Sequence, residues 1–282
     1  MVEGVSNFAL YDMLKGNLYK FSMEGSIEEL RRSLLAEGLI FETGGIVPNK
    51  IMNINIRNLQ EKLSIRELQI RLNGRGEDTC WNKVKKKVKK QSMTREIVDK
   101  IIAGCEFIPV DKIRIDAEDG DWDKIEQIID GIKCNRIQTN IHGLTGEEFQ
   151  NLEGKCHKKG ITLEAVGKKD LQKYKLEIFN FFYSKYFNPC LGHQVALDTR
   201  GEIKACLWLD EIIGNIDSDN LKDLIISGKF DKYWEISMEK IETCKECEMR
   251  FNCDDCRVLT LNKTGNLYAK PGHCHYDPYS GE

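Results

Sequence analysis

Four cysteines lie close together in the stretch CKECEMRFNCDDCR at residues 244–257. They form two C-x2-C steps, Cys244/Cys247 and Cys253/Cys256. Two thiolates separated by such a step can reach the same metal from one tight turn. A zinc ribbon typically places about 15–20 residues between its two steps, whereas only five residues separate Cys247 from Cys253. The spacing indicates a metal-binding module, and it makes a simple four-cysteine zinc site a strained interpretation.

Three further cysteines fall in the same part of the chain. The stretch NPCLGHQVALDTRGEIKACLWL contains Cys190 and Cys206 and predicts a β-hairpin that turns at Gly201 and brings the two cysteines together. Cys274 follows in KPGHCHYDPYSGE. The other four cysteines are isolated, and those at positions 105, 134 and 156 are expected to be small packing residues.

Composition and charge limit the cellular compartments and the classes of binding partner that fit this sequence. The 282 residues include 42 basic and 45 acidic side chains, so the formal charge of -3 does not demand nucleic acid as a partner. The N-terminus has no apolar signal-peptide core, and no segment approaches about 18 apolar residues. We therefore predict a soluble cytoplasmic protein without a membrane partner. In that reducing compartment, eleven cysteines favour metal binding over a disulfide framework.

The upstream half alternates between strand-like and helix-like segments. Its apolar, partly β-branched runs lie at residues 68–72, 112–117, 136–142 and 161–167. Its helix-like segments lie at residues 93–104, 121–132, with Asp121 as a candidate N-cap, and 145–160. This order predicts an α/β fold with a partial (β/α) barrel-like parallel sheet. The repeats are too few for a complete barrel, which needs about 250 residues.

Three domains are expected from these patterns. Residues 1–50 are predicted to form a small N-terminal α+β subdomain, with a capped helix from Ser26 to Gly38. Residues 51–187 are predicted to form the truncated barrel, and residues 188–282 the cysteine-rich domain. Within the barrel, the basic run KVKKKVKK at residues 83–90 is interpreted as the solvated face of a helix-like segment.

The order of the seven C-terminal cysteines adds a resemblance. The pattern C-x10-G-x4-C, followed by C-x2-C-x5-C-x2-C and a last cysteine, closely resembles the SPASM domain, the C-terminal extension of radical SAM enzymes that mature peptides and proteins. The match covers residues 188–282. One spacing departs from the family pattern, because only Asp254 and Asp255 precede the sixth cysteine where the family usually has three residues.

The resemblance implies two auxiliary [4Fe–4S] clusters with interleaved ligands. By position, the first cluster set comprises Cys190, Cys206 and Cys256, and the second cluster set comprises Cys244, Cys247, Cys253 and Cys274. The eighth cysteine that is frequent in the family is absent from FFYSKYFN, which precedes the first set. The first cluster would therefore have an open or non-cysteine fourth position, for which His193, His273 or a substrate group are candidates.

The C-x3-C-x2-C motif that radical SAM catalysis requires does not occur in the sequence, and Cys80 alone follows the first barrel strand. We therefore expect no S-adenosylmethionine and no radical chemistry by this chain alone. A truncated barrel joined to a SPASM module looks like the grasp-with-spasm peptide maturases. That resemblance implies a ribosomally made precursor peptide and an ATP-grasp ligase, or another peptide-modifying enzyme, as partners.

Three functional hypotheses remain open, and whether the chain is an enzyme is undecided between them. In the first, the protein binds the precursor peptide and presents it to a partner, with structural clusters. In the second, the clusters relay electrons or bind substrate at an open iron. In the third, bound zinc stabilises a module that interacts with other proteins. A strand edge able to accept a peptide would favour the first, a polar cavity beside the clusters the second, and colourless protein with bound zinc the third.

Overall fold

A computed structural model describes residues 2–3, 5, 7–12, 17–22, 26–36, 63–74, 77–79, 85–87, 90–142, 146–165, 178–253 and 255–281. The chain forms two compact units, and both are discontinuous in sequence. Unit 1 comprises Met1–Glu61, Leu171–Pro189 and Ile236–Glu282, and unit 2 comprises Lys62–Asp170 and Cys190–Glu235. The predicted division at residues 50 and 187 stays a prediction, and the segment predicted as the SPASM domain contributes to both units. Cys80, Asp254 and the expected helix end at Gly38 lie outside the described residues.

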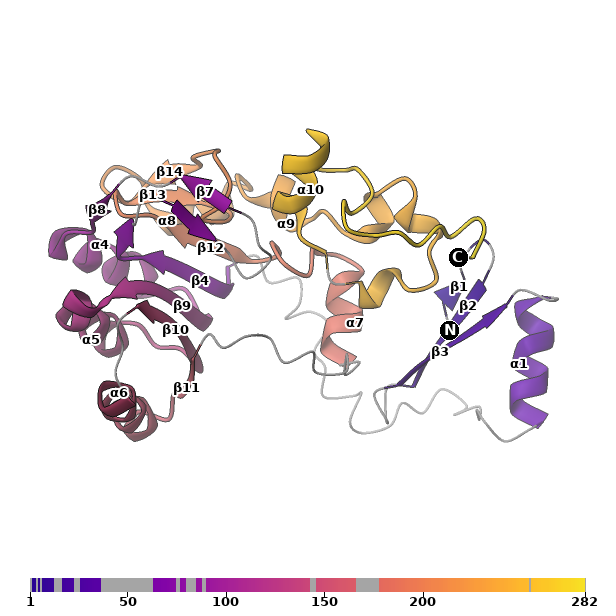
Figure 1. The fold of residues 1–282 in the computed structure, drawn as a ribbon, viewed down its shortest axis with the longest axis horizontal. Helices are drawn as coiled ribbons and strands as arrows, with labels where there is room; N and C mark the ends of the chain where they lie inside the picture. Colours follow the sequence, from indigo (N-terminus) through magenta and orange to yellow (C-terminus); the bar gives the residue numbers. More distant parts are fainter. Residues whose placement is uncertain are drawn as a thin grey trace. The chain divides into compact units, whose positions relative to one another are not determined.

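Unit 2 is built on a seven-stranded, mostly parallel sheet, so the predicted α/β class is confirmed at this level (Figure 1). Its strand order is β11-β10-β9-β4-β12-β13-β14. The strands from β11 to β12 are parallel, β13 is antiparallel to β12, and β14 is antiparallel to β13. The strands are β4 (Ile65–Arg71), β9 (Val110–Glu118), β10 (Arg136–His142), β11 (Thr162–Ala165), β12 (Gln194–Leu197), β13 (Glu202–Lys204) and β14 (Gly214–Asn215).

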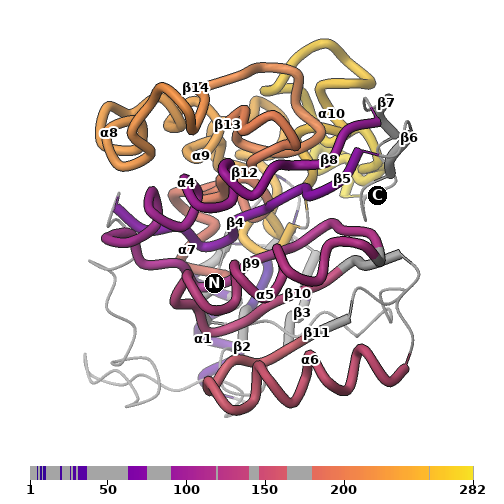
Figure 2. The backbone as a smooth tube through the Cα atoms, turned by 90° about the vertical axis from the view of Figure 1, so that its left-hand side faces the viewer, coloured from indigo at the N-terminus to yellow at the C-terminus, as the bar shows by residue number. Residues whose placement is uncertain are grey.

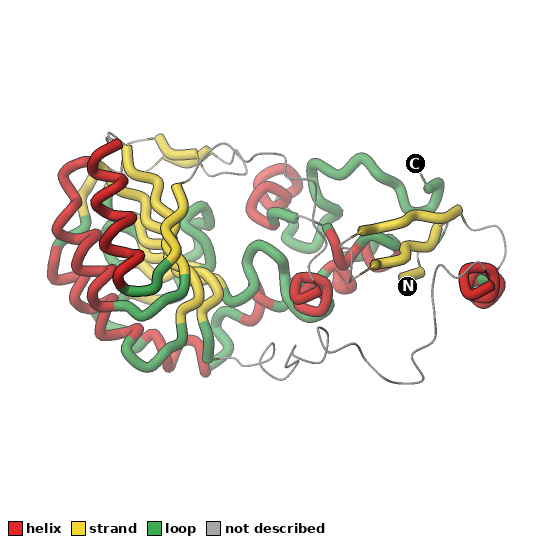
Figure 3. The backbone as a smooth tube through the Cα atoms, turned by 90° about the horizontal axis from the view of Figure 1, so that it is seen from below, coloured by secondary structure: helices red, strands yellow, loops and turns green. Residues whose placement is uncertain are grey.

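Three crossover helices cover one face of this sheet (Figure 3). They are α4 (Arg95–Cys105), α5 (Trp122–Gly131) and α6 (Gly146–Lys158). Because β4, β9, β10 and β11 are neighbours in the same order in sequence and in space, crossovers of one hand place every helix on the same side. The core between helices and sheet is apolar and includes Leu68, Ile70, Val98, Ile101, Ile113, Ile115, Ile125, Ile128 and Ile137.

The opposite face of the sheet is polar and yet buried. In β4, Glu67, Gln69 and Arg71 alternate with the apolar residues, and all three are at most 8% exposed. The strand register sets Gln69 beside Arg114 and Arg71 beside Asp116 on β9. A sheet with helices on both faces is usually apolar on both. This alternation therefore marks a sheet that helices cover on one face only, as the partial-barrel prediction expects.

Smaller elements complete unit 2. Two short antiparallel ladders flank the sheet, β5 (Asn73–Gly74) with β8 (Gln91–Ser92) and β6 (Glu77–Thr79) with β7 (Lys85–Lys87). Helices α8 (Leu221–Ile226) and α9 (Asp231–Trp234) follow β14, and Trp208 and Trp234 are buried in unit 2.

In unit 2 one local prediction was wrong, and another, Asp121 as the N-cap of α5, was confirmed in position only. Part of the basic run, predicted as helix-like, is strand β7, and its register places Lys86 and Lys87 opposite Asp78 and Glu77. Opposite charges at facing positions favour such a ladder. Asp121 occupies the N-cap position of α5, but its carboxylate does not cap that helix. It accepts hydrogen bonds from Asn73 and Lys124 and from the backbone N–H of Glu118 instead.

The predicted hairpin is confirmed as β12 and β13, and Gly201 forms its turn with a φ of +73°. A side chain at this position would strain the backbone, and its Cβ would lie 2.7 Å from Ile216 Cγ2.

We expect Gly201→Ala to lower the free energy of unfolding by about 1–3 kcal/mol, measured by urea unfolding with tryptophan fluorescence. Gly154→Ala is the control, because Gly154 lies within α6 with no atom within 4 Å of the added Cβ. Equal stability of the two variants would contradict the assignment.

Unit 1 combines an N-terminal sheet with the cysteine-rich segment (Figure 2). Its antiparallel sheet has the order β1 (Val2–Glu3), β2 (Asn7–Asp12), β3 (Asn17–Ser22). Helix α1 (Ile27–Ala36) begins with the expected capping box: the Ser26 N–H donates to the Glu29 carboxylate, and the Glu29 N–H donates to Ser26 Oγ. The remaining elements are α7 (Ile178–Ser184), α10 (Arg257–Thr264) and the 3-10 turns η2 (Met238–Lys240), η3 (Cys244–Glu246) and η4 (Arg250–Asn252).

Throughout the described ranges, every helix is too short or too polar to cross a lipid bilayer.

Candidate metal centre

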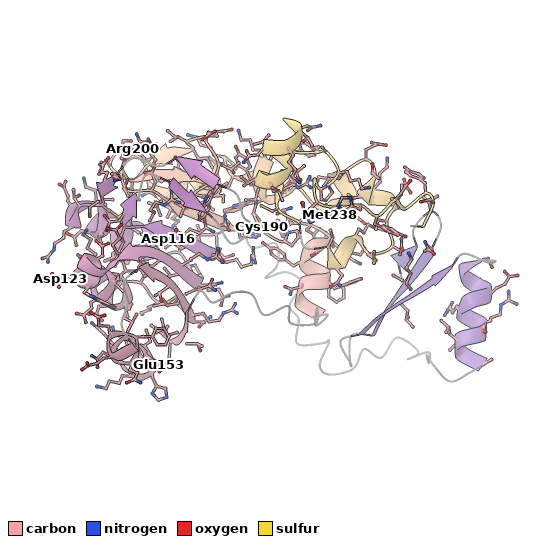
Figure 4. All side chains as sticks on the ribbon, in the orientation of Figure 1. Asp116, Asp123, Glu153, Cys190, Arg200 and Met238 are labelled. Carbon is pink, nitrogen blue, oxygen red and sulfur yellow. The ribbon has the colours of Figure 1, made fainter. Side chains whose placement is uncertain are left out.

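The thiols of the second cluster set all belong to unit 1. Cys244 begins η3, Cys247 directly follows it, Cys253 follows η4, and Cys274 lies in the loop after α10. Cys244 packs in a small apolar cluster with Ile236, Met238 and Ile241, and Cys253 contacts the same cluster. Met238 is labelled in Figure 4. The short 3-10 turns η3 and η4 lie between these cysteines and keep the segment compact.

These four thiols are close enough to influence one another electrostatically. Burial raises the pKa of the Cys244 thiol to about 12, Arg257 opposes this rise, and the charges of Asp255, Cys247 and Cys274 add to it. Burial also raises the pKa of Cys253, and the charges of Asp255, Cys244, Cys274 and Cys247 raise it further. In the metal-free protein Cys244 and Cys253 are therefore protonated near neutral pH. Binding of a metal group would have to displace their protons, so it is favoured as the pH rises.

The donor set has the chemistry of an all-thiolate group, because its four members are cysteines of one unit. Within the described ranges, however, no three His, Cys, Asp or Glu side chains are close enough together to hold a single metal ion. None of the ten described cysteines forms a disulfide, which leaves the thiols available as ligands.

The first cluster set is divided between the units. Cys256 is the N-cap residue of α10 in unit 1 and is buried. Cys190 and Cys206 lie at the open end of the β12–β13 hairpin in unit 2, where Cys190 precedes β12 and Cys206 follows β13 (Figure 4). The assignment of these three residues to one cluster stays a prediction.

An arginine fixes the turn that carries Cys190. The Arg66 guanidinium donates to the carbonyl oxygens of Cys190 at 3.0 Å and of Gly192 at 3.1 Å. The carbonyl oxygen of His193 accepts from the Arg66 N–H at 2.8 Å, so this turn is attached to β4. His193, a candidate fourth ligand, is 3% exposed, and its ring contacts that of Trp234 in a tilted arrangement with 4.8 Å between centroids. The other candidate, His273, lies next to Cys274 in unit 1.

The N-terminal sheet is attached to the cysteine-rich segment by a polar network. The Val5 N–H donates to the carbonyl of Glu246 at 3.0 Å. The buried Glu248 carboxylate accepts from the Tyr276 hydroxyl at 2.7 Å, and that hydroxyl accepts from the Asn7 amide at 3.0 Å. Lys20 of β3 lies over the Tyr276 ring. The neighbours of Cys247 and Cys274 in sequence therefore contact the sheet directly.

No protein-family model matches the chain, and no curated protein matches it either. Several solved structures are similar in part. BtrN in complex with AdoMet and 2-DOIA is 12% identical with a TM-score of 0.36, and the match covers 67% of this chain and 98% of BtrN. Native anSMEcpe with bound AdoMet and Cp18Cys peptide is 12% identical with a TM-score of 0.41, covering 77% of this chain and 94% of anSMEcpe. Streptococcus suis SuiB bound to precursor peptide SuiA is 10% identical with a TM-score of 0.40, covering 96% of this chain and 99% of SuiB.

These TM-scores are all below 0.5, so the similarities decide neither the family nor the function of this chain. Two of the three structures hold AdoMet, and the expectation that this chain does not bind S-adenosylmethionine stays a prediction.

Sequence reasoning missed the residues that support the thiols. Arg66, Glu248 and Arg257 are ordinary charged residues in the sequence, and their partners are backbone carbonyls or residues far along the chain. The alternation in IRELQIR at residues 65–71 predicts a polar face for β4, but Arg66 falls on the side of Leu68 and Ile70, so this signal does not identify it.

Proposed function

We propose that this chain is an iron–sulfur protein of the SPASM type that acts in the maturation of a ribosomally synthesised peptide. It binds the precursor peptide and presents it to a partner modifying enzyme, such as an ATP-grasp ligase. It performs no radical SAM chemistry of its own. Its metal ligands are Cys190, Cys206 and Cys256 in the first cluster set and Cys244, Cys247, Cys253 and Cys274 in the second.

The observation that supports this proposal most strongly is that Cys244 and Cys253 pack against the same apolar cluster. Cys247 directly follows the 3-10 turn that Cys244 begins, so it belongs to the same compact segment. Cysteines that only fill space in a core need not lie near one another, whereas the thiolates that bind one cluster must lie close together. An iron–sulfur cluster would supply electron transfer or a Lewis-acidic iron at this place. The protein's own residues exclude water from it, since Cys244 packs among Ile236, Met238 and Ile241.

The peptide-binding part of the proposal is supported by the edge of the N-terminal sheet. Among the described strands, β3 pairs with β2 alone. A strand edge of this kind can accept an extended peptide as an additional strand, with main-chain hydrogen bonds giving affinity. Because the same sheet contacts the segments around Cys247 and Cys274, a peptide on β3 would lie in the same unit as the second cluster set.

The test uses synthetic peptides whose sequences are encoded by the short reading frames beside this chain's gene. We expect the peptide that binds to protect the N–H groups of β3 from hydrogen exchange. Successive residues of a strand direct their N–H groups to opposite sides. One of the variants Leu18→Pro and Tyr19→Pro therefore removes an edge donor, and the other removes a donor to β2. The variant that keeps the β2–β3 pairing, identified by hydrogen exchange without peptide, should lose the peptide-induced protection. Unchanged protection in that variant, or no protection of β3 in the wild type, would contradict strand addition.

A further inference from the structure

A buried arginine interacts with the turn between two of the cysteines. Arg257, the first residue of α10, has a side chain with 0% exposure. Its Nε forms an ion pair with Asp255, and its Nη2 donates to Asp255 Oδ1 at 2.7 Å. Asp255 lies between Cys253 and Cys256 and is itself 1% exposed. The guanidinium thus fixes the conformation of this C-x2-C step.

The same guanidinium also holds the loop that leads to Cys274. Nη1 donates to the carbonyl oxygens of Leu267 at 2.7 Å and Ala269 at 2.9 Å. Nη2 donates to Thr260 Oγ1 at 3.3 Å, and this hydroxyl oxygen accepts from the Gly272 N–H at 3.3 Å. One side chain therefore connects the C-x2-C step, helix α10 and the following loop.

Asn188 completes the arrangement from another part of the chain. Its amide donates to Asp255 Oδ2 at 3.2 Å and to the carbonyl of Ile236 at 3.3 Å. A buried ion pair of this kind often contributes less stability than apolar residues of the same volume, because both charges lose their hydration. The planar fork of arginine, by contrast, can set several acceptors in one fixed geometry. The arrangement is suited to positioning rather than to stability alone.

We propose that Arg257 is a positioning residue that assembles the second cluster set before the metal group binds. It holds the Cys253–Cys256 step and the Cys274 loop at a fixed separation, as supporting residues do around metal ligands. The inference rests on the proposed role of these thiols as metal ligands. It does not depend on whether the metal is iron or zinc.

The first test measures the metal-free protein. Each cysteine is alkylated with iodoacetamide under reducing, chelating conditions, and the labelling rate at each position is read by mass spectrometry. We expect Arg257→Met to label Cys253 and Cys274 about tenfold faster than the wild type, because the loop opens locally. Arg257→Lys, which keeps the charge but not the fork, should be intermediate. Lys245→Met is the matched control, since Lys245 is exposed beside Cys244, and its one described ion pair is with Glu242.

Hydrogen exchange of β2 and β3 in the same samples separates positioning from folding, because both strands belong to unit 1. We expect exchange there to match the wild type in Arg257→Met. Labelling of Cys253 and Cys274 at the wild-type rate would overturn the proposal. A parallel rise of labelling and of exchange in β2 and β3 would also overturn it, because Arg257 would then support the unit as a whole.

The second test loads each variant anaerobically with ferrous iron and sulfide, or with zinc alone, and counts bound metal. We expect Arg257→Met to bind less of whichever metal the wild type accepts, and Lys245→Met to bind the wild-type amount. Equal loading of Arg257→Met and wild type would overturn the positioning role without affecting the cluster assignment. A wild type that accepts only zinc would overturn the iron–sulfur function, while the comparison between variants would still test Arg257.

Discussion

Replacing Asp255 with alanine is expected to destabilise the cysteine-rich segment of unit 1, residues 236–281, by about 3–5 kcal/mol, the usual effect of removing one partner from a buried ion pair. Asp255 and Arg257 both have side chains with 0% exposure. The substitution would leave the guanidinium charge buried without its carboxylate, and Asn188 would lose an acceptor. The charge cannot relocate to water, because Leu267 and Ala269 hold the guanidinium through their carbonyls.

The measurement is urea unfolding of the metal-free protein, monitored by hydrogen exchange of peptides from residues 236–281. Asp255→Asn should be nearly as destabilised as the alanine variant, because charge rather than shape is lost. Glu242→Ala is the control, since Glu242 is 89% exposed in its pair with Lys245 and such surface pairs contribute about 0–1 kcal/mol. If Asp255→Ala lost no more stability than Glu242→Ala, the buried ion pair would not have the importance assigned to it.

Acidification is expected to destabilise unit 2 through His193. Burial, with a further contribution from the charge of Arg66, lowers the pKa of His193 from 6.5 to about 4, and Asp231 opposes this shift only in part. The folded unit therefore holds the neutral imidazole, while the unfolded chain binds a proton near pH 6.5. The stabilising contribution is complete above pH 6.5 and is lost as the pH falls from there to about 4. At about 1.4 kcal/mol for each pKa unit, the full loss is roughly 3 kcal/mol.

The matched variant is His193→Asn, because His193 has a φ of +49° and asparagine tolerates that conformation. The fluorescence of Trp234, whose ring contacts that of His193, reports unfolding. Between pH 7 and pH 4.5 the wild type should lose roughly 2–3 kcal/mol more than His193→Asn. Parallel pH profiles for the two proteins would show that His193 is not buried in its neutral form.

Local patterns in the sequence predicted much of unit 2. The run at residues 112–117 became the centre of β9, and the helix expected at 93–104 became α4, because hydrophobic periodicity directly encodes which face of an element is buried. Gly201 was identifiable because a tight turn with positive φ favours glycine. The candidate ligands came from the resemblance of the seven-cysteine pattern to the SPASM domain, and their assignment stays a prediction.

The remainder depends on contacts between distant residues. The parallel pairing of β12 with β4 joins residues 194–197 to residues 67–70, and no local pattern specifies that partner. The sheet of β2 and β3 was also missed, because MVEGVSNFALYDMLKGNLYKF has only short apolar runs without clear alternation. The role of Arg257 could not be predicted for a similar reason. Two of its acceptors are backbone carbonyls, which every residue has and which therefore leave no pattern in the sequence.

The central claim, that the C-terminal cysteines bind iron–sulfur clusters, is tested most directly by the iron, acid-labile sulfide and zinc content of anaerobically purified protein, together with its absorption spectrum. Two [4Fe–4S] clusters predict about eight irons with matching sulfide per chain and a broad visible band, and Cys253→Ser should lose about four of those irons. Colourless protein that contains zinc but no iron or sulfide would contradict the assignment.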